Sequence, residues 1–376
     1  MINLAKKIEK KEFTKSKIIL FLGAGFSSLI EYPLMNKFIF KLGGNIFEPI
    51  LDPEEQEFIE VVSILKNTTD LEEIFGILES AIKANYILRK EDFFKLKEDQ
   101  KGGITFPNYI NPTQYRRWVD DFKTSQIEDK VVTICKNITL KIKKEIFKIY
   151  RPKEDIDYLV KYGNFFDTIL NLAKIDKKTV FIPIFTTNYD VIIEKYFENL
   201  NNNNIGIFNF FNSKNEFDPN IIQGKIFNKE TIISIMHLHG SIFFYKDIIE
   251  NKILNTPISS YLEDKRYENK IIYPLKDKTP IEEPFFTYYD YFSRCLDNAK
   301  YLIVVGYSFR DSESLNRIKS SLIFNKELKI IIIDSNAYKI KENIFNNSEK
   351  IISLNYYFDS QSFKDIIYKD LIKNIV

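Results

Sequence analysis

Four short apolar runs, spread along the chain, constrain the fold more than any other feature of the sequence. They are Lys17–Leu22, Thr179–Phe185, Tyr301–Val305 and Leu328–Ile333. Their apolar residues are continuous rather than alternating, and polar or glycine residues follow each run at once. Such runs are typical of strands that are covered on both faces, as in a parallel sheet. We therefore expect an α/β fold with a Rossmann-like parallel sheet.

Two weaker runs, Ile232–Leu238 and Ile351–Phe358, are candidates for further strands. Pro183 conflicts with a central strand at Thr179–Phe185, because proline has no N–H to donate to a neighbouring strand.

Helical periodicity dominates the stretch between the first two apolar runs. Thr69–Ile87, Gln126–Tyr150 and Asp155–Lys174 are expected to form helices from the spacing of their apolar residues. Val191–Leu200 is a further expected helix. We therefore divide the chain into a discontinuous nucleotide-binding core, residues 1–45 and 178–376, and a large helical insertion, residues 46–177. Residues 246–280 are expected to form a long irregular connection.

Charge and cysteine content limit the classes of partner. The chain has 54 Lys and Arg residues against 52 Asp and Glu, a net charge of +2. That near-balance argues against binding to nucleic acid or to an acidic membrane. The N-terminus lacks the apolar segment of a signal peptide, and no run reaches the roughly 18 apolar residues of a membrane span. Cys135 and Cys295 are too far apart in sequence to suggest a metal site, so we expect a cytoplasmic protein without a metal.

A turn of small residues, Gly23-Ala24-Gly25-Phe26-Ser27, follows the first apolar run. It matches the G-x-G-x-x-G pattern only in part, because residue 28 is serine. Pro33 is placed to begin a helix. A strand, a small-residue turn and a helix N-terminus together form an anion site. A plain strand-to-helix turn is the alternative.

Two further stretches place polar groups at the ends of predicted strands. Thr187, Asn188 and Asp190 follow the second run, where they either cap the next helix or face a ligand at the carboxyl edge of the sheet. Gly306 and Ser308 follow the third run and form either a plain turn or a ligand contact.

The only two histidines, His237 and His239, lie at the end of a weaker predicted strand. In an extended segment both side chains lie on one face. No third ligand accompanies them, so zinc is not expected. His237 suits a structural role, whereas His239, which precedes Gly240 and Ser241, suits a general base.

Taken in order, the motifs GAGFS, TTNYD, HLHGS and VVGYSFRD resemble those of the sirtuin-like family. Members of this family bind NAD across a Rossmann-type sheet. The resemblance covers the expected core and leaves the helical insertion outside it.

The resemblance implies roles for individual residues. Asn188, Asp190 and His239 match the catalytic set, in which the asparagine lies beside the nicotinamide ribose. Asp334, which follows the fourth apolar run, matches a contact to the adenosine ribose. The full set of residues that would contact the dinucleotide is Gly23, Ala24, Gly25, Phe26, Ser27, Thr187, Gly306, Ser308 and Asp334.

Two departures from the family pattern disfavour a protein deacylase. Sirtuin deacylases carry a four-cysteine zinc module, which a chain with two cysteines cannot build. They also continue the glycine turn with Pro-Asp-Phe-Arg, whereas Leu34, Met35 and Asn36 follow Pro33 here. The chain looks more like the bacterial sirtuin-like effectors of antiphage defence, which have a helical insertion and consume NAD.

The function that this resemblance implies is hydrolysis of NAD at its nicotinamide–ribose bond, with NAD as substrate and no metal. Control by oligomerisation or by a second protein such as an ATPase is expected, with the helical insertion as the contact. The alternatives are a sensor of NAD or ADP-ribose without catalysis, a structural subunit with a vestigial site, and an ADP-ribosyl transferase or cyclase.

Overall fold

The computed structural model describes residues 16–32, 51–65, 74, 76–78, 127–174, 180–221, 229–262, 264–272, 282–358 and 368–375. The chain divides into two compact units. The first comprises Met1–Leu34, Phe147–Ile272 and Lys276–Val376, and the second comprises Met35–Ile146 and Tyr273–Leu275. The first unit contains all of the motifs described above.

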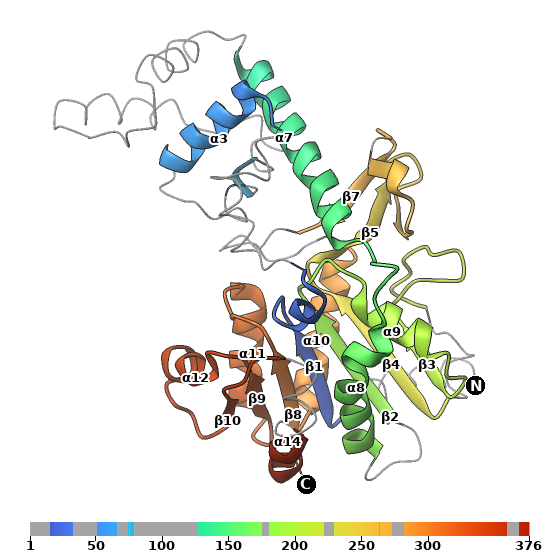
Figure 1. Cartoon of the computed structure of the whole chain (residues 1–376), viewed down its shortest axis with the longest axis vertical. Coiled ribbons are helices and arrows are strands. Elements are labelled where there is room, and N and C mark those ends of the chain that lie inside the picture. The colour runs from blue at the N-terminus through green and yellow to red at the C-terminus, as the bar shows by residue number, and fades with distance from the viewer. Residues whose placement is uncertain are drawn as a thin grey trace, which may run out of the picture. The chain divides into compact units, whose positions relative to one another are not determined.

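A seven-stranded parallel sheet forms the centre of the first unit, with the order β10-β9-β8-β1-β2-β4-β3 (Figure 1). Its strands are β1 (Ile18–Leu22), β2 (Val180–Thr186), β3 (Ile205–Phe208), β4 (Thr231–His237), β8 (Tyr301–Val305), β9 (Lys329–Ile333) and β10 (Ile351–Leu354). The α/β fold and all six predicted strands are thus confirmed, although β10 ends at Leu354 rather than at Phe358.

Ser16 removes the difficulty that Pro183 posed for a central strand. Val180 donates its N–H to Glu230 O, and Thr186 O accepts the N–H of Leu238, so the backbone of both β2 residues faces the β4 side. Backbone groups of successive residues point to opposite sides of a strand, so the nitrogen of Pro183 faces β1. The carbonyl of Ile18, which a peptide N–H at this position would meet, lies 2.6 Å from the hydroxyl of Ser16 instead. A local side chain thus occupies the acceptor that proline leaves unused.

Helices cover both faces of the sheet. On one face lie α8 (Tyr158–Lys174) and α9 (Ile192–Leu200), where Phe166 packs 4.5 Å from the ring of Tyr196. On the other lie α10 (Phe285–Asn298), α11 (Ser312–Phe324) and α12 (Ala337–Phe345), where Phe292 packs 5.4 Å from the ring of Phe21. A short helix, α14 (Tyr368–Ile375), ends the described part of the chain.

The direction in which the chain crosses the sheet reverses between β1 and β8. After β1 the chain proceeds toward β3, and after β8 it proceeds toward β10. Right-handed crossovers in opposite directions place the connecting helices on opposite faces. In open α/β sheets, ligands bind outside the carboxyl ends of the strands at such a reversal.

A small antiparallel sheet includes parts of the segment 246–280, for which an irregular connection was predicted. It has the order β6-β5-β7, with β5 at Gly240–Asp247, β6 at Lys252–Asn255 and β7 at Tyr267–Ile271. The prediction was wrong because β6 and β7 are short, partly exposed and rich in charged residues. They lack the continuous apolar pattern that marks a buried strand.

In the second unit, α3 (Pro53–Leu65) begins with a reciprocal capping box. The backbone N–H of Asp52 donates to Glu55, and the N–H of Glu55 donates to Asp52, each over 2.9 Å. The long helix α7 (Ile127–Tyr150) matches the predicted helix 126–150 and crosses the division between the units. The predicted helix at Pro33 lies outside the described residues, as does most of 69–87.

The boundary of the predicted insertion differs from the division of the structure. We expected the insertion to extend to residue 177, whereas α8 packs against β2 and α9 in the first unit. An amphipathic helix that covers a sheet has the same apolar spacing as one in a helical bundle, so sequence periodicity does not separate the two.

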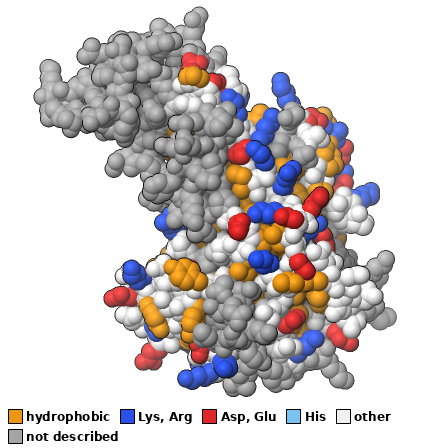
Figure 2. Space-filling view, in the orientation of Figure 1, with side chains coloured by type: hydrophobic (Ala, Val, Ile, Leu, Met, Phe, Trp, Pro, Cys, Tyr) orange, Lys and Arg blue, Asp and Glu red, His pale blue; other side chains and the backbone are white. Residues whose placement is uncertain are grey.

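Among the described residues, no helix is long and apolar enough to span a bilayer. On the face in Figure 2, the coloured acidic and basic side chains are interspersed.

Candidate active site

The glycines of the small-residue turn are required by a close contact between two turns. Gly23 N–H donates to Val305 O and Gly25 N–H donates to Gly306 O, each over 2.9 Å. A Cβ on Gly23 would lie 2.5 Å from Gly306 O, and one on Gly25 would lie 2.6 Å from Gly306 Cα. Gly306 itself has a φ of 59°, which favours glycine. The turns after β1 and β8 therefore meet backbone to backbone at the point where the strand order reverses.

Most amides of the glycine turn are already used within the chain. The N–H groups of Phe26, Ser27 and Ser28 donate to the carbonyls of residues 23, 24 and 25 and form the short 3-10 helix Phe26–Ile30. Within the described residues, the N–H of Ala24 has no acceptor. The sequence predicts a turn of bare amides around a pyrophosphate, and the structure leaves this one turn amide for such a contact.

Phe26, a predicted contact to the dinucleotide, has its side chain in the core. Its ring is 1% exposed and packs 4.8 Å from the ring of Tyr162 and 4.9 Å from that of Phe358. The hydroxyl of Tyr162 donates to the carbonyl of Phe26 over 3.2 Å. Phe26 therefore anchors the turn on α8, and its ring is not available to a ligand.

Asn188 is held against the glycine turn. Its carboxamide nitrogen donates to Gly23 O over 2.9 Å and to the hydroxyl of Ser27 over 2.8 Å. That hydroxyl donates in turn to Asp190 over 2.7 Å. Both amide hydrogens of Asn188 are thereby used, and the carboxamide oxygen remains as an acceptor.

Thr186, the last residue of β2, fixes the backbone that carries Asn188. Its hydroxyl donates to Leu22 O over 2.9 Å and accepts the N–H of Asn188 over 3.0 Å. Thr186 was not among the predicted site residues, although its place at the end of a predicted strand, next to the polar stretch, was a usable signal. Thr187, a predicted contact to the dinucleotide, is half-buried and donates its N–H to Leu22 O over 3.3 Å.

Asp190 is a buried carboxylate with an orienting position. Besides the hydroxyl of Ser27, it accepts the N–H of Ile192 over 3.2 Å at the start of α9. Burial raises the pKa of Asp190 to about 6, and the hydrogen bonds from Ser27 and Ile192 oppose that rise. Its contacts tie the loop after β2 to the glycine turn.

His237 is buried between two acceptors. Its Nδ1 lies 3.0 Å from the backbone oxygen of Asn188, and its Nε2 lies 2.7 Å from Glu194. Burial alone would lower the pKa of His237, but the charge and hydrogen bond of Glu194 and the carbonyl of Asn188 raise it above its usual value. The ring of His237 thus holds the backbone at Asn188, which fits the structural role predicted for this residue.

Among the described residues, no group of three His, Cys, Asp or Glu could hold a metal ion.

His239 belongs to a second buried cluster. Its Nε2 lies 3.1 Å from Asp311, which follows β8 and also accepts the hydroxyls of Tyr289 and Ser314. Burial alone would raise the pKa of Asp311, but these hydrogen bonds outweigh it and hold the pKa well below its usual range. Asp311 was not among the predicted site residues, although it stands in the motif VVGYSFRD.

The two clusters lie at the same edge of the sheet without a direct hydrogen bond among the described residues. His239 follows β4 and Asp311 follows β8, and β2 and β1 lie between these strands. His239 and Asp311 therefore meet across the ends of β2 and β1, the strands that precede Asn188 and the glycine turn. The backbone links the clusters as well, because His237 contacts Asn188 and lies two residues before His239.

Ser308 and Asp334 lie at the ends of β8 and β9. Ser308 is exposed, and within the described residues neither its N–H nor its hydroxyl has a partner. Asp334 is half-buried and accepts the N–H of Asn336 over 2.7 Å. Burial raises the pKa of Asp334. Together with Ala24, these residues offer one hydroxyl, two amides and one carboxylate along the carboxyl edge.

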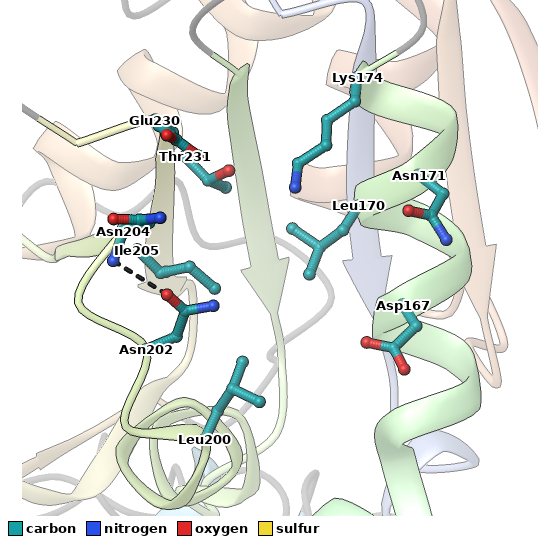
Figure 3. A pocket seen from close by; sticks show the side chains of 10 residues that line it. All are labelled: Asp167, Leu170, Asn171, Lys174, Leu200, Asn202, Asn204, Ile205, Glu230 and Thr231. Atoms are coloured by element: carbon teal, nitrogen blue, oxygen red, sulfur yellow. Dashed lines mark hydrogen bonds between the residues drawn. The ribbon is translucent and has the colours of Figure 1, made fainter.

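A pocket of about 300 Å³ lies elsewhere, between the end of α8 and the start of β4 (Figure 3). Lys174, the last residue of α8, and Thr231, the first residue of β4, both line it. Because β4 begins at Thr231, this pocket lies at the amino edge of the sheet, opposite the glycine turn. None of the predicted site residues lines it.

Comparison with known proteins identifies the domain. Residues 183–352 match the model of the SIR2-like domain, which includes Asn188, His239 and Gly306 but not the glycine turn after β1. A comparison with curated proteins gives no match.

Several solved structures are similar to this chain at low identity. A Sir2-homologue mutant in complex with 2′-O-acetyl ADP ribose is 12% identical, covers 98% of this chain and 97% of its own, and has a TM-score of 0.42. A second Sir2-homologue mutant, with ADP ribose, is 13% identical at 98% and 95% coverage, with a TM-score of 0.41. A Sir2 homologue with NAD is 12% identical at 98% and 95% coverage, with a TM-score of 0.41. The domain match assigns a SIR2-like domain to residues 183–352 of this chain.

Proposed function

We propose that this protein is an NAD⁺ hydrolase that cleaves the nicotinamide–ribose bond and releases nicotinamide and ADP-ribose. The SIR2-like domain supports the use of NAD. The observation that carries the proposal is the hydrogen bonding of Asn188 to Gly23 and Ser27. This contact joins the group proposed to hold the ribose to the turn proposed to meet the phosphates.

The chemistry requires little beyond geometry and charge. Nicotinamide leaves as a neutral molecule from a cationic ring, so the transition state is an oxocarbenium-like sugar, as in glycoside cleavage. The C–N bond breaks, a water oxygen bonds to the anomeric carbon, and the water loses one proton. His239 is proposed to accept that proton, a contribution typically worth about 10²–10⁴ in rate.

Asn188 is proposed to orient the sugar. Since its carboxamide hydrogens are used by Gly23 and Ser27, its oxygen is the atom that can accept a hydrogen bond from a ribose hydroxyl or from the attacking water. Asp190 is proposed to hold Ser27 in place rather than to attack the sugar, because it is buried and already accepts two donors. Ala24 N–H and Ser308 are proposed to contact the pyrophosphate.

The test is to follow NAD loss and product identity by chromatography for the wild-type chain, Asn188→Ala and His239→Ala. Each substitution should abolish nicotinamide release while circular dichroism stays that of the wild type. Asn203→Ala, which removes an exposed carboxamide from the loop before β3, is the matched control and should retain full activity. Turnover close to the wild-type rate in Asn188→Ala or His239→Ala would remove the assignment.

The same assay separates the alternative functions. A sensor would bind NAD or ADP-ribose, measured by calorimetry, without loss of NAD. A cyclase or an ADP-ribosyl transferase would yield cyclic ADP-ribose or a modified acceptor in place of free ADP-ribose. A structural subunit would neither bind nor cleave.

We further propose that the enzyme is an antiphage-defence effector that stays inactive until it oligomerises or meets a partner such as an ATPase. An unrestrained hydrolase would exhaust the NAD of its own cell. Met35–Ile146, the part of the second unit that lies outside the SIR2-like domain, is proposed to carry the contact. Activity measured against protein concentration, together with mass photometry, tests this. A monomer that is fully active at all concentrations and insensitive to added partners would contradict it.

A further inference from the structure

Asp311 lies where it can determine which nitrogen of His239 acts. Its Oδ2 accepts from the Nε2 of His239 over 3.1 Å, from the hydroxyl of Tyr289 over 3.1 Å and from the hydroxyl of Ser314. Its Oδ1 accepts the N–H of Glu313 over 3.0 Å, which caps α11. Each oxygen of this buried carboxylate therefore has a donor.

The donors around Asp311 are themselves fixed. Tyr289 is 1% exposed on α10, and the guanidinium of Arg317 lies 5.3 Å from the centre of its ring. Arg317 also donates to the carbonyl of Tyr289 and to the hydroxyl of Ser293, over 3.3 and 2.7 Å. The side chains of α10 and α11 thus hold the carboxylate in one position.

An ionised carboxylate can only accept hydrogen bonds, and this one keeps a pKa well below its usual range. The Nε2 of His239 must therefore carry a hydrogen in order to bond to it. In a neutral imidazole the other nitrogen, Nδ1, is then the acceptor. Among the described residues, Nδ1 of His239 has no hydrogen-bond partner.

We propose that Asp311 is a positioning residue that holds His239 in the Nε2–H tautomer, so that Nδ1 is the atom that takes the proton of the attacking water. This inference rests on the proposed hydrolysis and names the part of it that the fold determines. The proton moves from water to Nδ1, and the charge that develops on the ring is stabilised by the carboxylate at Nε2. Asp311 does not become protonated in this step.

The direct test is nitrogen NMR of the chain labelled with ¹⁵N-histidine. The protein has only two histidines, so His237→Gln assigns both spectra. At the pH of maximal activity, His239 should show a protonated Nε2 and a bare Nδ1. The opposite tautomer, or a ring protonated at both nitrogens throughout the pH range of activity, would overturn the proposal. This arm needs no catalytic turnover, so it separates failure of the tautomer from failure of the proposed hydrolysis.

The kinetic test is Asp311→Asn. With the tautomer no longer selected, kcat should fall by about 10²–10⁴ while KM changes by less than about threefold, as expected for loss of a positioned base. Asp157→Asn is the matched control, because Asp157 also accepts backbone N–H groups at a helix start, those of Leu159 and Val160, but contacts no histidine. Wild-type kcat in Asp311→Asn, or an unchanged His239 tautomer in its NMR spectrum, would refute the role of Asp311.

Discussion

Replacing the glycines of the two touching turns tests whether they serve packing or a ligand. In Gly25→Ala the new Cβ would lie 2.6 Å from Gly306 Cα, at a backbone φ of −63° that suits alanine. The cost is therefore steric alone, about 1–3 kcal/mol for overpacking of a tight contact. The neighbouring backbone has little freedom to withdraw, because Gly306 is hydrogen-bonded to both Gly25 and Ile333.

Gly306→Ala adds a second cost. Its Cβ would lie 2.4 Å from Gly25 Cα, and its φ of 59° costs a non-glycine residue about 1–2 kcal/mol more. The sum, roughly 2–5 kcal/mol, corresponds to a fall in Tm of roughly 5–15 °C. Gly163→Ala in α8 is the control, since nothing lies within 4 Å of its added Cβ, and it should gain about 0.5–1 kcal/mol.

The assay is thermal denaturation of the NAD-free variants, followed by circular dichroism. If the glycines served only the approach of a nucleotide, Gly25→Ala and Gly306→Ala would melt with the wild type and lose only NAD binding. An unchanged Tm in both variants would refute the packing argument.

Three further predictions concern the residues around Asn188. Asp190→Asn should stabilise the protein by up to about 3 kcal/mol at pH 8. The folded pKa of Asp190 is raised from 3.8 to about 6, so the wild-type protein loses stability as the pH rises through that interval. Urea melts should show the gain vanishing near pH 4, and an equal gain at both pH values would contradict the reasoning. Glu194→Gln should destabilise the protein, by about 3–5 kcal/mol where His237 is charged, because the neutral carboxamide no longer balances the charge of that buried ring. Since the pKa of His237 is raised, the stability that the pair of His237 and Glu194 provides is complete below the unfolded pKa of about 6.5 and is lost as the pH rises through the folded value. A difference in unfolding free energy between wild type and variant that does not shrink with rising pH would exclude this. Thr186→Val keeps the shape of the side chain but removes both hydrogen bonds of the hydroxyl. It should cost about 1–3 kcal/mol in the same melts and lower kcat, because the N–H of Asn188 loses its acceptor. An unchanged kcat would argue that this bond does not position Asn188.

Local patterns determined the class of fold. Six strands and their parallel arrangement followed from short apolar runs, because a strand buried on both faces must be apolar along its whole length. The same reasoning placed Asn188, His239 and Gly306 after strands, and hence at one edge. It failed for β6 and β7, which pair with β5 but have mixed polar sequences without a continuous apolar run.

Only the tertiary structure decided which of these groups meet. Asp311 and His239 are 72 residues apart, and their pairing depends on the order β4-β2-β1-β8, which no local spacing contains. Likewise, the sequence marks Gly23 and Gly25 as small, but only the fold brings Gly306 against them and gives packing as the reason. Burial and hydrogen bonding between distant segments are properties of the folded sheet. The pKa shifts of Asp190, His237 and Asp311 depend on them, so the sequence alone could not predict these shifts.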